Sequence, residues 1–441
     1  MRSWKRVLVC GLGASGRAAV RLLVREGVDV LAVDERDGLD QQAARLELQA
    51  ANCPVVLGVK HPPPGAFDAA VTSPGLSIGG PFLSEVRQRG IPVVSEVEVG
   101  WSRFGGRTIA VTGSNGKSSV VKALAECLRA SGRTAVPCGN YGRPVCDVVW
   151  NEPQPDWLVI EVSSFQLETC IEFRPDMAVL LNLQPNHLDR HGSMEEYERL
   201  KVRIFAQQRG TDVAVIPADW MARHQGSVVG GGRWVTFGAD LQADYRYEPG
   251  FLRERGGGAI EIAGSSFDNP VLGPNAAALY GAARSAGIDA DWIRNALVNF
   301  EPLPHRAQGV GVWNGVTYVD DSKATNLAAM MASIRMQSKP VWLIAGGRPK
   351  ESCFQAARGR LREQVRGVFL IGEAAAAMAA EWGDVVSCEE CGTLECAVAA
   401  ARRAARPGEV VLLAPACTAF DQFPSYAARG DRFQNILVEK D

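Results

Sequence analysis

Short apolar runs alternate along the chain with amphipathic stretches, the pattern of strands and helices that pack in layers. The first runs lie at residues 7–10 and 28–33, and between them Ala19, Leu22 and Leu23 follow the spacing of one helix face. Further strand-like runs lie at residues 69–72, 91–94, 108–111, 157–162, 177–183, 316–319, 341–345, 368–371 and 410–413. This alternation predicts an α/β fold.

The length of 441 residues exceeds what one hydrophobic core usually organises, so we expect about three domains. Two segments have the composition of linkers: Gly105-Gly106, and residues 301–304, whose two prolines disfavour both helix and central strand. We therefore predict domains at residues 1–104, 105–303 and 304–441. Within the second, the glycine-rich segments 230–232 and 256–258 predict β-hairpins.

The composition is that of an ordinary globular protein, with 46% hydrophobic residues, 22% charged residues and a formal net charge of −2. Without a basic surplus we expect no nucleic-acid partner. No apolar run approaches the ~20 residues that span a bilayer, and the run after the basic N-terminus is too short for a signal peptide. The close cluster Cys388, Cys391 and Cys396 lacks a fourth zinc ligand. We expect a cytoplasmic protein with reduced thiols and no membrane partner.

Two glycine-rich loops lie between a strand and a helix. Gly11-x-Gly13-x-x-Gly16, followed by Asp34, matches the dinucleotide fingerprint, in which glycines let the backbone approach a pyrophosphate. Alone it does not distinguish NAD from UDP or from a tight structural turn. The second loop is more specific for ATP, although Val111 stands where a strict phosphate loop has its first glycine. Its candidate ATP-binding residues are Gly113, Ser114, Asn115, Gly116, Lys117, Ser118 and Ser119. There Lys117 would neutralise phosphates and Ser118 would bind Mg²⁺.

Polar residues follow several later strands, where open α/β sheets place ligands. Glu161 stands in an otherwise apolar strand, and a carboxylate there is costly unless paired, so we predict a metal ligand. Residues 182–191 leave the next strand and precede a helix in which Lys201 is predicted to face inward. In the last domain, residues 320–326, 346–350 and 416–423 form three polar loops at strand ends. These loops predict a second face of the same active site.

These motifs together resemble the Mur ligases over essentially the whole chain. Residues 112–119 match the ATP loop of that family, residues 321–326 its D-S-K-A-T-N motif, and His305-Arg306 its P-H-R junction. Residues 161–168 and 11–16 resemble the branch that adds D-glutamate. The resemblance implies a Rossmann-like UDP-binding domain, a central P-loop ATPase-like domain and a C-terminal Rossmann-like domain.

The resemblance also implies roles for individual residues. UDP and the muramoyl group would be bound by Ala14, Ser15, Asp34, Arg36, Ser73, Gly75, Asn140 and Ser163. Two Mg²⁺ ions would be held by Ser118, Glu161, His187 and Lys201, with Lys201 carbamylated; Lys117, Glu161, His187 and Lys201 would be the catalytic residues. Beyond the loop, ATP would contact Asn275, Arg306 and Asp321. The amino acid would contact Lys323, Thr325, Lys350, Thr418, Ala419 and Phe420.

The implied reaction joins D-glutamate to UDP-N-acetylmuramoyl-L-alanine through an acyl phosphate, with ATP and a monomeric enzyme, in peptidoglycan precursor synthesis. Two positions depart from the family pattern: Val271-Leu272 replace a His-Asn pair on the adenine side, and Ala419 replaces a serine on the amino-acid side. A ligase of the same mechanism that adds another amino acid, such as L-glutamate, remains open. A nucleotide-gated binding protein would leave the combination of Glu161, His187, Lys201 and Lys350 unexplained. An NAD-dependent oxidoreductase would leave the ATP loop unexplained.

Overall fold

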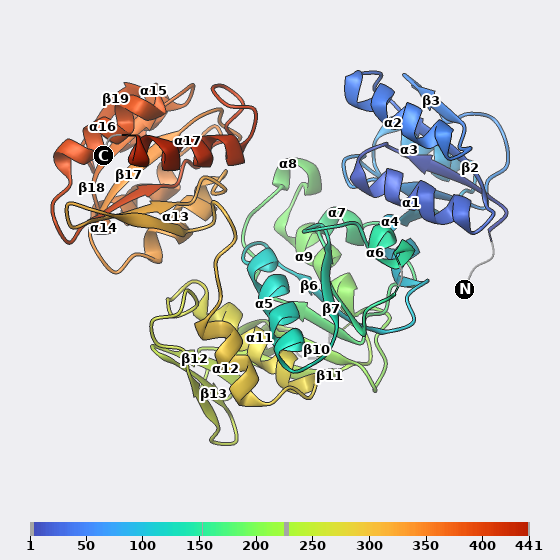
Figure 1. The fold of residues 1–441 in the computed structure, drawn as a ribbon, viewed down its shortest axis with the longest axis horizontal. Coiled ribbons are helices and arrows are strands. Elements are labelled where there is room, and N and C mark those ends of the chain that lie inside the picture. Colours follow the sequence, from blue (N-terminus) through green and yellow to red (C-terminus); the bar gives the residue numbers. More distant parts are fainter. Residues whose placement is uncertain (1–3, 152, 225–228, 440–441) are drawn as a thin grey trace. The chain divides into compact units, whose positions relative to one another are not determined.

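The computed structural model describes residues 4–151, 153–224 and 229–439. It divides into two units, Met1–Phe267 with Gly273–Asn299, and Asp268–Leu272 with Phe300–Asp441. The first unit holds a five-stranded and a nine-stranded sheet, and the second a six-stranded sheet (Figure 1). Most strand pairs are parallel and helices pack on the sheets, so the predicted α/β fold is confirmed. Across the described part of the chain, no helix has both the length and the apolarity of a membrane span.

The first sheet is wholly parallel, with strand order β3-β2-β1-β4-β5. Its strands are β1 (Arg6–Cys10), β2 (Asp29–Asp34), β3 (Val55–Leu57), β4 (Ala69–Thr72) and β5 (Val93–Ser95). Its helices are α1 (Ala14–Arg25), α2 (Leu39–Ala50) and α3 (Pro81–Gln88), and α4 (Glu96–Trp101) follows β5. The helices α1 and α2 belong to one apolar cluster and α3 to another, so both faces of the sheet are covered. The strand order reverses between β1 and β4, which is where doubly wound folds bind ligands.

The second sheet has the order β14-β13-β12-β11-β10-β9-β6-β8-β7 and is parallel from β7 to β12. Its strands are β6 (Arg107–Thr112), β7 (Ala135–Gly139), β8 (Trp157–Glu161), β9 (Met177–Leu180), β10 (Val213–Pro217), β11 (Arg233–Gly238), β12 (Tyr245–Glu248), β13 (Phe251–Glu254) and β14 (Ala259–Glu261). Its helices are α5 (Lys117–Ala130), α6 (Val145–Trp150), α7 (Ser164–Leu167), α8 (Leu188–His191), α9 (Met194–Val202), η1 (Arg203–Phe205), α10 (Ala218–Arg223), α11 (Gly273–Ser285) and α12 (Ala290–Val298).

Only one of the two predicted glycine-rich hairpins forms. Residues 256–258 connect β13 to β14, which pair antiparallel, so this hairpin is confirmed. The prediction for residues 230–232 is wrong, because they lead into β11, which pairs parallel with β10. The chain passes through α10 between these two strands, and a helical crossover of this kind returns the next strand parallel.

The third sheet has the order β15-β16-β20-β17-β18-β19, and its one antiparallel pair is β15 with β16. Its strands are β15 (Gln308–Trp313), β16 (Val316–Asp320), β17 (Val341–Gly346), β18 (Val365–Ile371), β19 (Cys388–Gly392) and β20 (Val410–Leu413). Its helices are α13 (Leu327–Arg335), η2 (Gln355–Ala357), α14 (Arg358–Gln364), α15 (Ala375–Trp382), α16 (Leu394–Ala404) and α17 (Tyr426–Val438). Apolar residues of α13–α15 pack in one cluster and those of α16 and α17 in another, which again covers both sheet faces.

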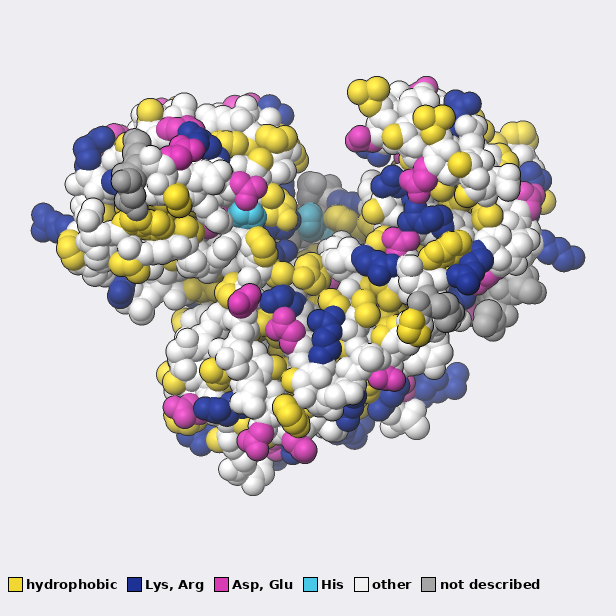
Figure 2. Space-filling model, in the orientation of Figure 1, with side chains coloured by type: hydrophobic (Ala, Val, Ile, Leu, Met, Phe, Trp, Pro, Cys, Tyr) yellow, Lys and Arg dark blue, Asp and Glu magenta, His cyan; other side chains and the backbone are white. Residues whose placement is uncertain are grey.

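Charged side chains of both signs are interspersed over the visible surface (Figure 2), in keeping with the formal net charge of −2. All eleven cysteines are free thiols. The predicted linker at residues 301–304 contains neither helix nor strand. The exact domain boundaries at residues 104 and 303 stay a prediction.

One buried carboxyl group in α4 makes the stability of the first unit depend on pH. Glu96 is 1% exposed; its Oε1 accepts a hydrogen bond from the backbone N–H of Cys146 at 2.7 Å, and its Oε2 has no hydrogen-bond partner in the described structure. Burial raises the pKa of Glu96 from 4.5 to about 7. Because the folded pKa is the higher one, the group favours folding fully below pH 4.5, and this contribution is lost as the pH rises through about 7.

We therefore expect Glu96→Gln, which mimics the protonated carboxyl, to be more stable than the wild type at pH 8 by up to about 3 kcal/mol. At pH 5, where the wild-type carboxyl is protonated in the folded protein, the difference should nearly vanish. Urea unfolding at both pH values measures this. Equal or lower stability of the variant at pH 8 would contradict the buried-carboxylate explanation.

Candidate active site

The predicted ATP loop connects the end of β6 to the start of α5. Gly113 and Gly116 have φ values of 149° and 83°, which favour glycine, and Gly116 is the N-cap of α5. A Cβ atom at Gly116 would lie 2.1 Å from Nδ2 of Asn275, so a side chain has no room there. The first N–H groups of a helix have no partner within the helix, so the start of α5 can bind an anion. The strand–loop–helix prediction is confirmed.

Two lysines meet at the carbonyl oxygen of Gly113. The ammonium group of Lys117 donates to this oxygen at 2.8 Å and to the Ser114 carbonyl at 2.9 Å. The Nζ atom of Lys201 donates to the same Gly113 oxygen at 2.9 Å and to Oγ1 of Thr112 at 3.3 Å. Lys201 is 1% exposed, which confirms that it faces inward. Burial, reinforced by the charge of Lys117, lowers the pKa of Lys201 well below its usual value, so its neutral amine is favoured.

A carboxylate, a hydroxyl and an amide come together beside this loop. Glu161, at the end of β8 and 3% exposed, accepts hydrogen bonds of 2.6 Å from Oγ of Ser118 and from Nδ2 of Asn140. Each oxygen of the buried carboxylate thus accepts a hydrogen bond, which offsets part of the cost of burying it. Carboxylate and hydroxyl oxygens are also the ligands that Mg²⁺ prefers, so the residues present fit such an ion.

The two histidines after β9 differ in their surroundings. His187 is exposed, has a φ of 55°, and lies with its ring 4.9 Å from that of Phe165. His191 is buried, its Nε2 lies 3.0 Å from Oγ of Ser164, and burial lowers its pKa. Prediction from the sequence selected His187 and missed His191, although both belong to the same polar segment. The hydroxyl of Ser163 caps α7, accepting from the backbone N–H of Gln166 at 3.2 Å.

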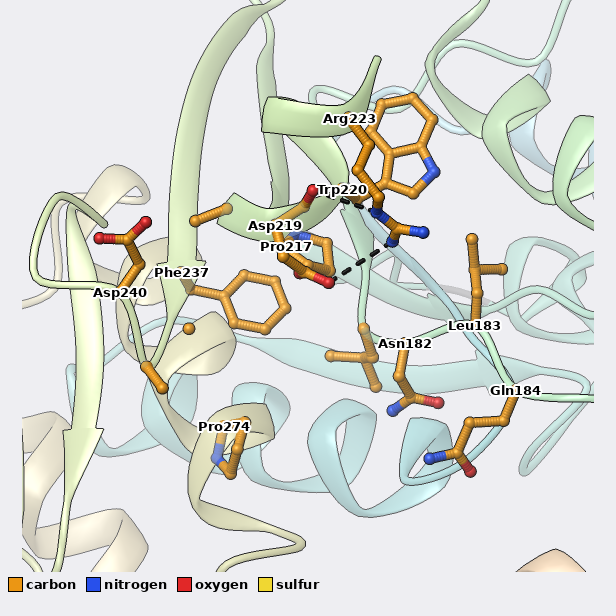
Figure 3. Close-up of a pocket in the computed structure, with 14 residues that line it drawn as sticks. Asn182, Leu183, Gln184, Pro217, Asp219, Trp220, Arg223, Phe237, Asp240 and Pro274 are labelled. Carbon is orange, nitrogen blue, oxygen red and sulfur yellow. Dashed lines mark hydrogen bonds and ion pairs between the residues drawn. The ribbon is translucent and has the colours of Figure 1, made fainter.

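A network of amide side chains fixes the loop and borders a pocket of about 410 Å³. The Oδ1 atom of Asn182 accepts from the Asn115 N–H at 2.9 Å, and its Nδ2 donates to Oδ1 of Asn275 at 3.2 Å. Gln184 accepts from the Asn115 side chain at 2.8 Å. Asn182 and Gln184 also line the pocket, together with Trp220, Phe237 and Pro274 from α10, the end of β11 and the start of α11 (Figure 3). The pocket therefore adjoins the ATP loop.

The N-terminal glycine fingerprint forms a second anion-binding loop, at the start of α1. A Cβ atom at Gly16 would lie 1.9 Å from the Gly11 carbonyl oxygen, so only glycine fits. Ala14 and Ser15 are the first residues of α1. The carboxylate of Asp34 accepts from the N–H groups of Leu12 at 2.8 Å and Arg36 at 2.9 Å, and therefore holds the loop in place.

Hydrogen bonds connect the residues beside this anion-binding loop to the segment after β9. Oγ of Ser73 donates to the Gly11 carbonyl at 3.0 Å. Gly75 lies between Pro74 and Leu76, whose carbonyl oxygens each accept a 3.0 Å hydrogen bond from the guanidinium of Arg190. The structure thus brings the predicted UDP residues together around the end of β1.

In the second unit, the predicted nucleotide residues lie at the end of β16. His305 donates from Nδ1 to the fully buried carboxylate of Asp320 at 2.7 Å, and Arg306 follows it, half-buried. Burial raises the pKa of the adjacent Asp321 to about 6. These contacts attach the P-H-R segment to the end of the strand.

The predicted amino-acid residues surround the ends of the same strands. The ammonium of Lys323 lies 3.9 Å from the ring centre of Tyr426, and Thr418 donates its hydroxyl to the Arg348 carbonyl at 3.0 Å. Ala419 is 2% exposed and Phe420 61% exposed. Lys350 is exposed and Thr325 half-buried. The hydroxyl of Thr418 is therefore already hydrogen-bonded within the protein.

Three family profiles match successive parts of the chain: the MurD-like N-terminal domain of Mur ligases at residues 5–95, the Mur ligase middle domain at 111–273, and the Mur ligase glutamate ligase domain at 305–417. A UDP-N-acetylmuramoylalanine–D-glutamate ligase of Acidobacterium capsulatum is 36% identical, over 98% of this chain and 96% of its own length. The chain belongs to the Mur ligase family. Its resemblance to that family, predicted from the motifs, is confirmed, and it is a ligase.

Further relatives and solved structures agree with this membership. A ligase of the same name from Nitratidesulfovibrio vulgaris is 39% identical over 97% of this chain and 94% of its own. The structure of a MurF ligase from Thermotoga maritima in complex with ADP superposes with a TM-score of 0.63 at 18% identity, covering 93% of this chain and 96% of that one. The MurC ligase of the same organism gives a TM-score of 0.61 at 15% identity over the full length of both. At such identities the two structures show the shared fold alone.

Proposed function

We propose that this Mur ligase uses ATP to join D-glutamate to UDP-N-acetylmuramoyl-L-alanine, releasing ADP and phosphate. The observation that carries the proposal is the near-full-length identity of 36–39% with ligases whose names state this substrate and this amino acid. The geometry around the ATP loop supports it. Two lysines, a hydrogen-bonded carboxylate and an anion-binding helix start lie together there, as transfer of a phosphoryl group to a carboxylate requires.

In this reaction the terminal L-alanine carboxylate attacks the γ-phosphate of ATP and gives an acyl phosphate with ADP as the leaving group. Lys117, already at the loop, would move its ammonium group from the Gly113 and Ser114 carbonyls to the transferring phosphoryl oxygens. Ser118 and Glu161 would hold one Mg²⁺, and His187 with carbamylated Lys201 a second, which when bound neutralise developing phosphoryl charge. Asn275, Arg306 and Asp321 would contact the nucleoside of ATP.

The amine of D-glutamate then attacks the acyl phosphate carbonyl, and phosphate leaves from the tetrahedral intermediate. Lys323 and Lys350, with Thr325, would bind the two carboxylates of the amino acid. Ala419 has no hydroxyl group, and the hydroxyl of Thr418 donates to the Arg348 carbonyl. The ammonium groups of Lys323 and Lys350 therefore provide most of the binding energy for the carboxylates. The start of α1, at Ala14 and Ser15, would hold the UDP pyrophosphate.

A phosphate-release assay with each component omitted in turn tests this proposal. We expect release to require ATP, UDP-N-acetylmuramoyl-L-alanine and an amino acid together. In a panel of D- and L-amino acids, D-glutamate should give the highest kcat/KM. A higher kcat/KM with L-glutamate or a neutral amino acid would contradict the assigned substrate. Phosphate release that does not require the amino acid would favour a nucleotide-gated binding protein.

A further inference from the structure

A buried guanidinium group lies where three strands of the third sheet end. Arg429, in the first turns of α17, is 1% exposed. Its Nε donates to Oγ of Ser322, and its Nη2 to the Ser322 carbonyl, both at 3.0 Å. It also donates to the carbonyls of Cys417 at 3.0 Å, Thr418 at 3.2 Å and Gly346 at 3.4 Å. One side chain thus binds the loops that follow β16, β17 and β20.

The partners of this guanidinium are all neutral. Among the described residues no carboxylate oxygen lies within ion-pair distance of Arg429, and its acceptors are four carbonyl oxygens and one hydroxyl. Burial lowers the pKa of Arg429 to about 10, so the group stays positively charged at neutral pH. The negative charges of Asp421 and Asp320 act on the guanidinium without a direct ion pair. Burying a positive charge without such a pair is costly, and a further anion nearby would offset that cost.

The three loops are the ones that carry the predicted amino-acid contacts. Ser322 precedes Lys323, and Thr418 precedes Ala419. A Cβ atom at Gly347 would lie 2.3 Å from the Thr418 carbonyl and 3.0 Å from Nη1 of Arg429, so the loop that leads to Lys350 also packs closely against this centre. A shift of the guanidinium would therefore move all three contact segments at once.

We propose that Arg429 is a positioning residue for the amino-acid substrate: it fixes the loops after β16, β17 and β20 in the arrangement that binds a dicarboxylic amino acid, and its charge favours the bound carboxylates. This inference rests on the proposed function. Arginine is needed because its planar fork reaches five acceptors on three segments, whereas a lysine ammonium has three donors at one point. Lysine would keep the charge and lose the simultaneous contacts.

The test compares Arg429→Lys and Arg429→Met with wild type, measuring KM for D-glutamate and KM for UDP-N-acetylmuramoyl-L-alanine separately. We expect KM for D-glutamate to rise about tenfold in Arg429→Lys and about a hundredfold in Arg429→Met, as loss of one and of several charge-assisted hydrogen bonds implies. KM for the UDP substrate should stay within about twofold, because that substrate binds to the first unit. Arg432→Met is the matched control, since Arg432 lies on the same helix and pairs at the surface with Glu395 and Glu439.

Calorimetric titration of each variant with UDP-N-acetylmuramoyl-L-alanine provides a check on folding that does not depend on turnover. Retained binding of this substrate with a selective loss for D-glutamate supports the proposal. An unchanged KM for D-glutamate in both variants, or an equal rise in every KM, would overturn it. If the wild type itself failed to respond to D-glutamate, the proposed function would fall instead, so the two failures are distinguishable.

Discussion

Replacing Lys117 with alanine is expected to lower kcat/KM by at least about 10³, the loss typical for a charge that stabilises a transferring phosphoryl group. The ammonium group already lies in the loop, 2.8 Å from the Gly113 carbonyl, so no other element has to move to bring it to the phosphates. Steady-state phosphate release measures the effect.

The matched control for this experiment is Lys122→Ala. Lys122 lies on the same helix but pairs with Glu126 at 3.2 Å, one helical turn further along, so its removal should leave kcat/KM within about twofold. If Lys117→Ala stayed within tenfold of the wild type, residues 112–119 would not be the ATP site.

Lys201→Ala should be nearly inactive, with kcat lowered by about 10³ or more, because the side chain would supply a metal-binding carboxylate. Burial lowers the pKa of Lys201 and so favours the neutral amine, which can attack CO₂, forming an N–C bond and releasing a proton, to give a carbamate. The space left by alanine should let formate or acetate restore part of the activity.

Lys201→Met separates this role from packing. Methionine fills the space of the lysine stem, so the variant should be inactive and insensitive to formate. The same carboxylates should not rescue Lys117→Ala. A carbamate signal in the wild-type enzyme treated with ¹³C-labelled CO₂ is expected by NMR. Full activity of Lys201→Ala would refute the role.

Prediction from the sequence was most successful where a buried strand ends in a polar loop. A parallel strand covered on both faces gives a continuous apolar run, and its carboxyl end places the ligand-binding loop, as at β6 and β8. The missed strands β10 and β11 lie inside the second sheet, whereas the missed strands β3, β7, β15 and β19 lie at sheet edges. There one side of the strand is unpaired and the apolar pattern is weak, as in the half-exposed Cys388–Gly392.

Long-range contacts explain what the sequence could not indicate. The strand predicted at residues 177–183 ends at Leu180, because the backbone of Leu181 and Asn182 bonds to Thr112 and Ser114 of the ATP loop instead. Arg429 belongs to an ordinary helical pattern, and its acceptors lie 11 to 107 residues away along the chain. The surroundings of His191 likewise depend on a contact with Ser164, which is 27 residues earlier in the chain.

The central claim is that a carboxylate of UDP-N-acetylmuramoyl-L-alanine is phosphorylated by ATP and then joined to D-glutamate. Incubating the enzyme with ATP, D-glutamate and a substrate whose alanine carboxylate carries oxygen-18 at both oxygens tests it in one mass-spectrometric measurement. We predict a product heavier by one glutamyl residue, together with inorganic phosphate that carries one oxygen-18 atom per turnover. Unlabelled phosphate, or labelled phosphate without the glutamyl product, would contradict the account.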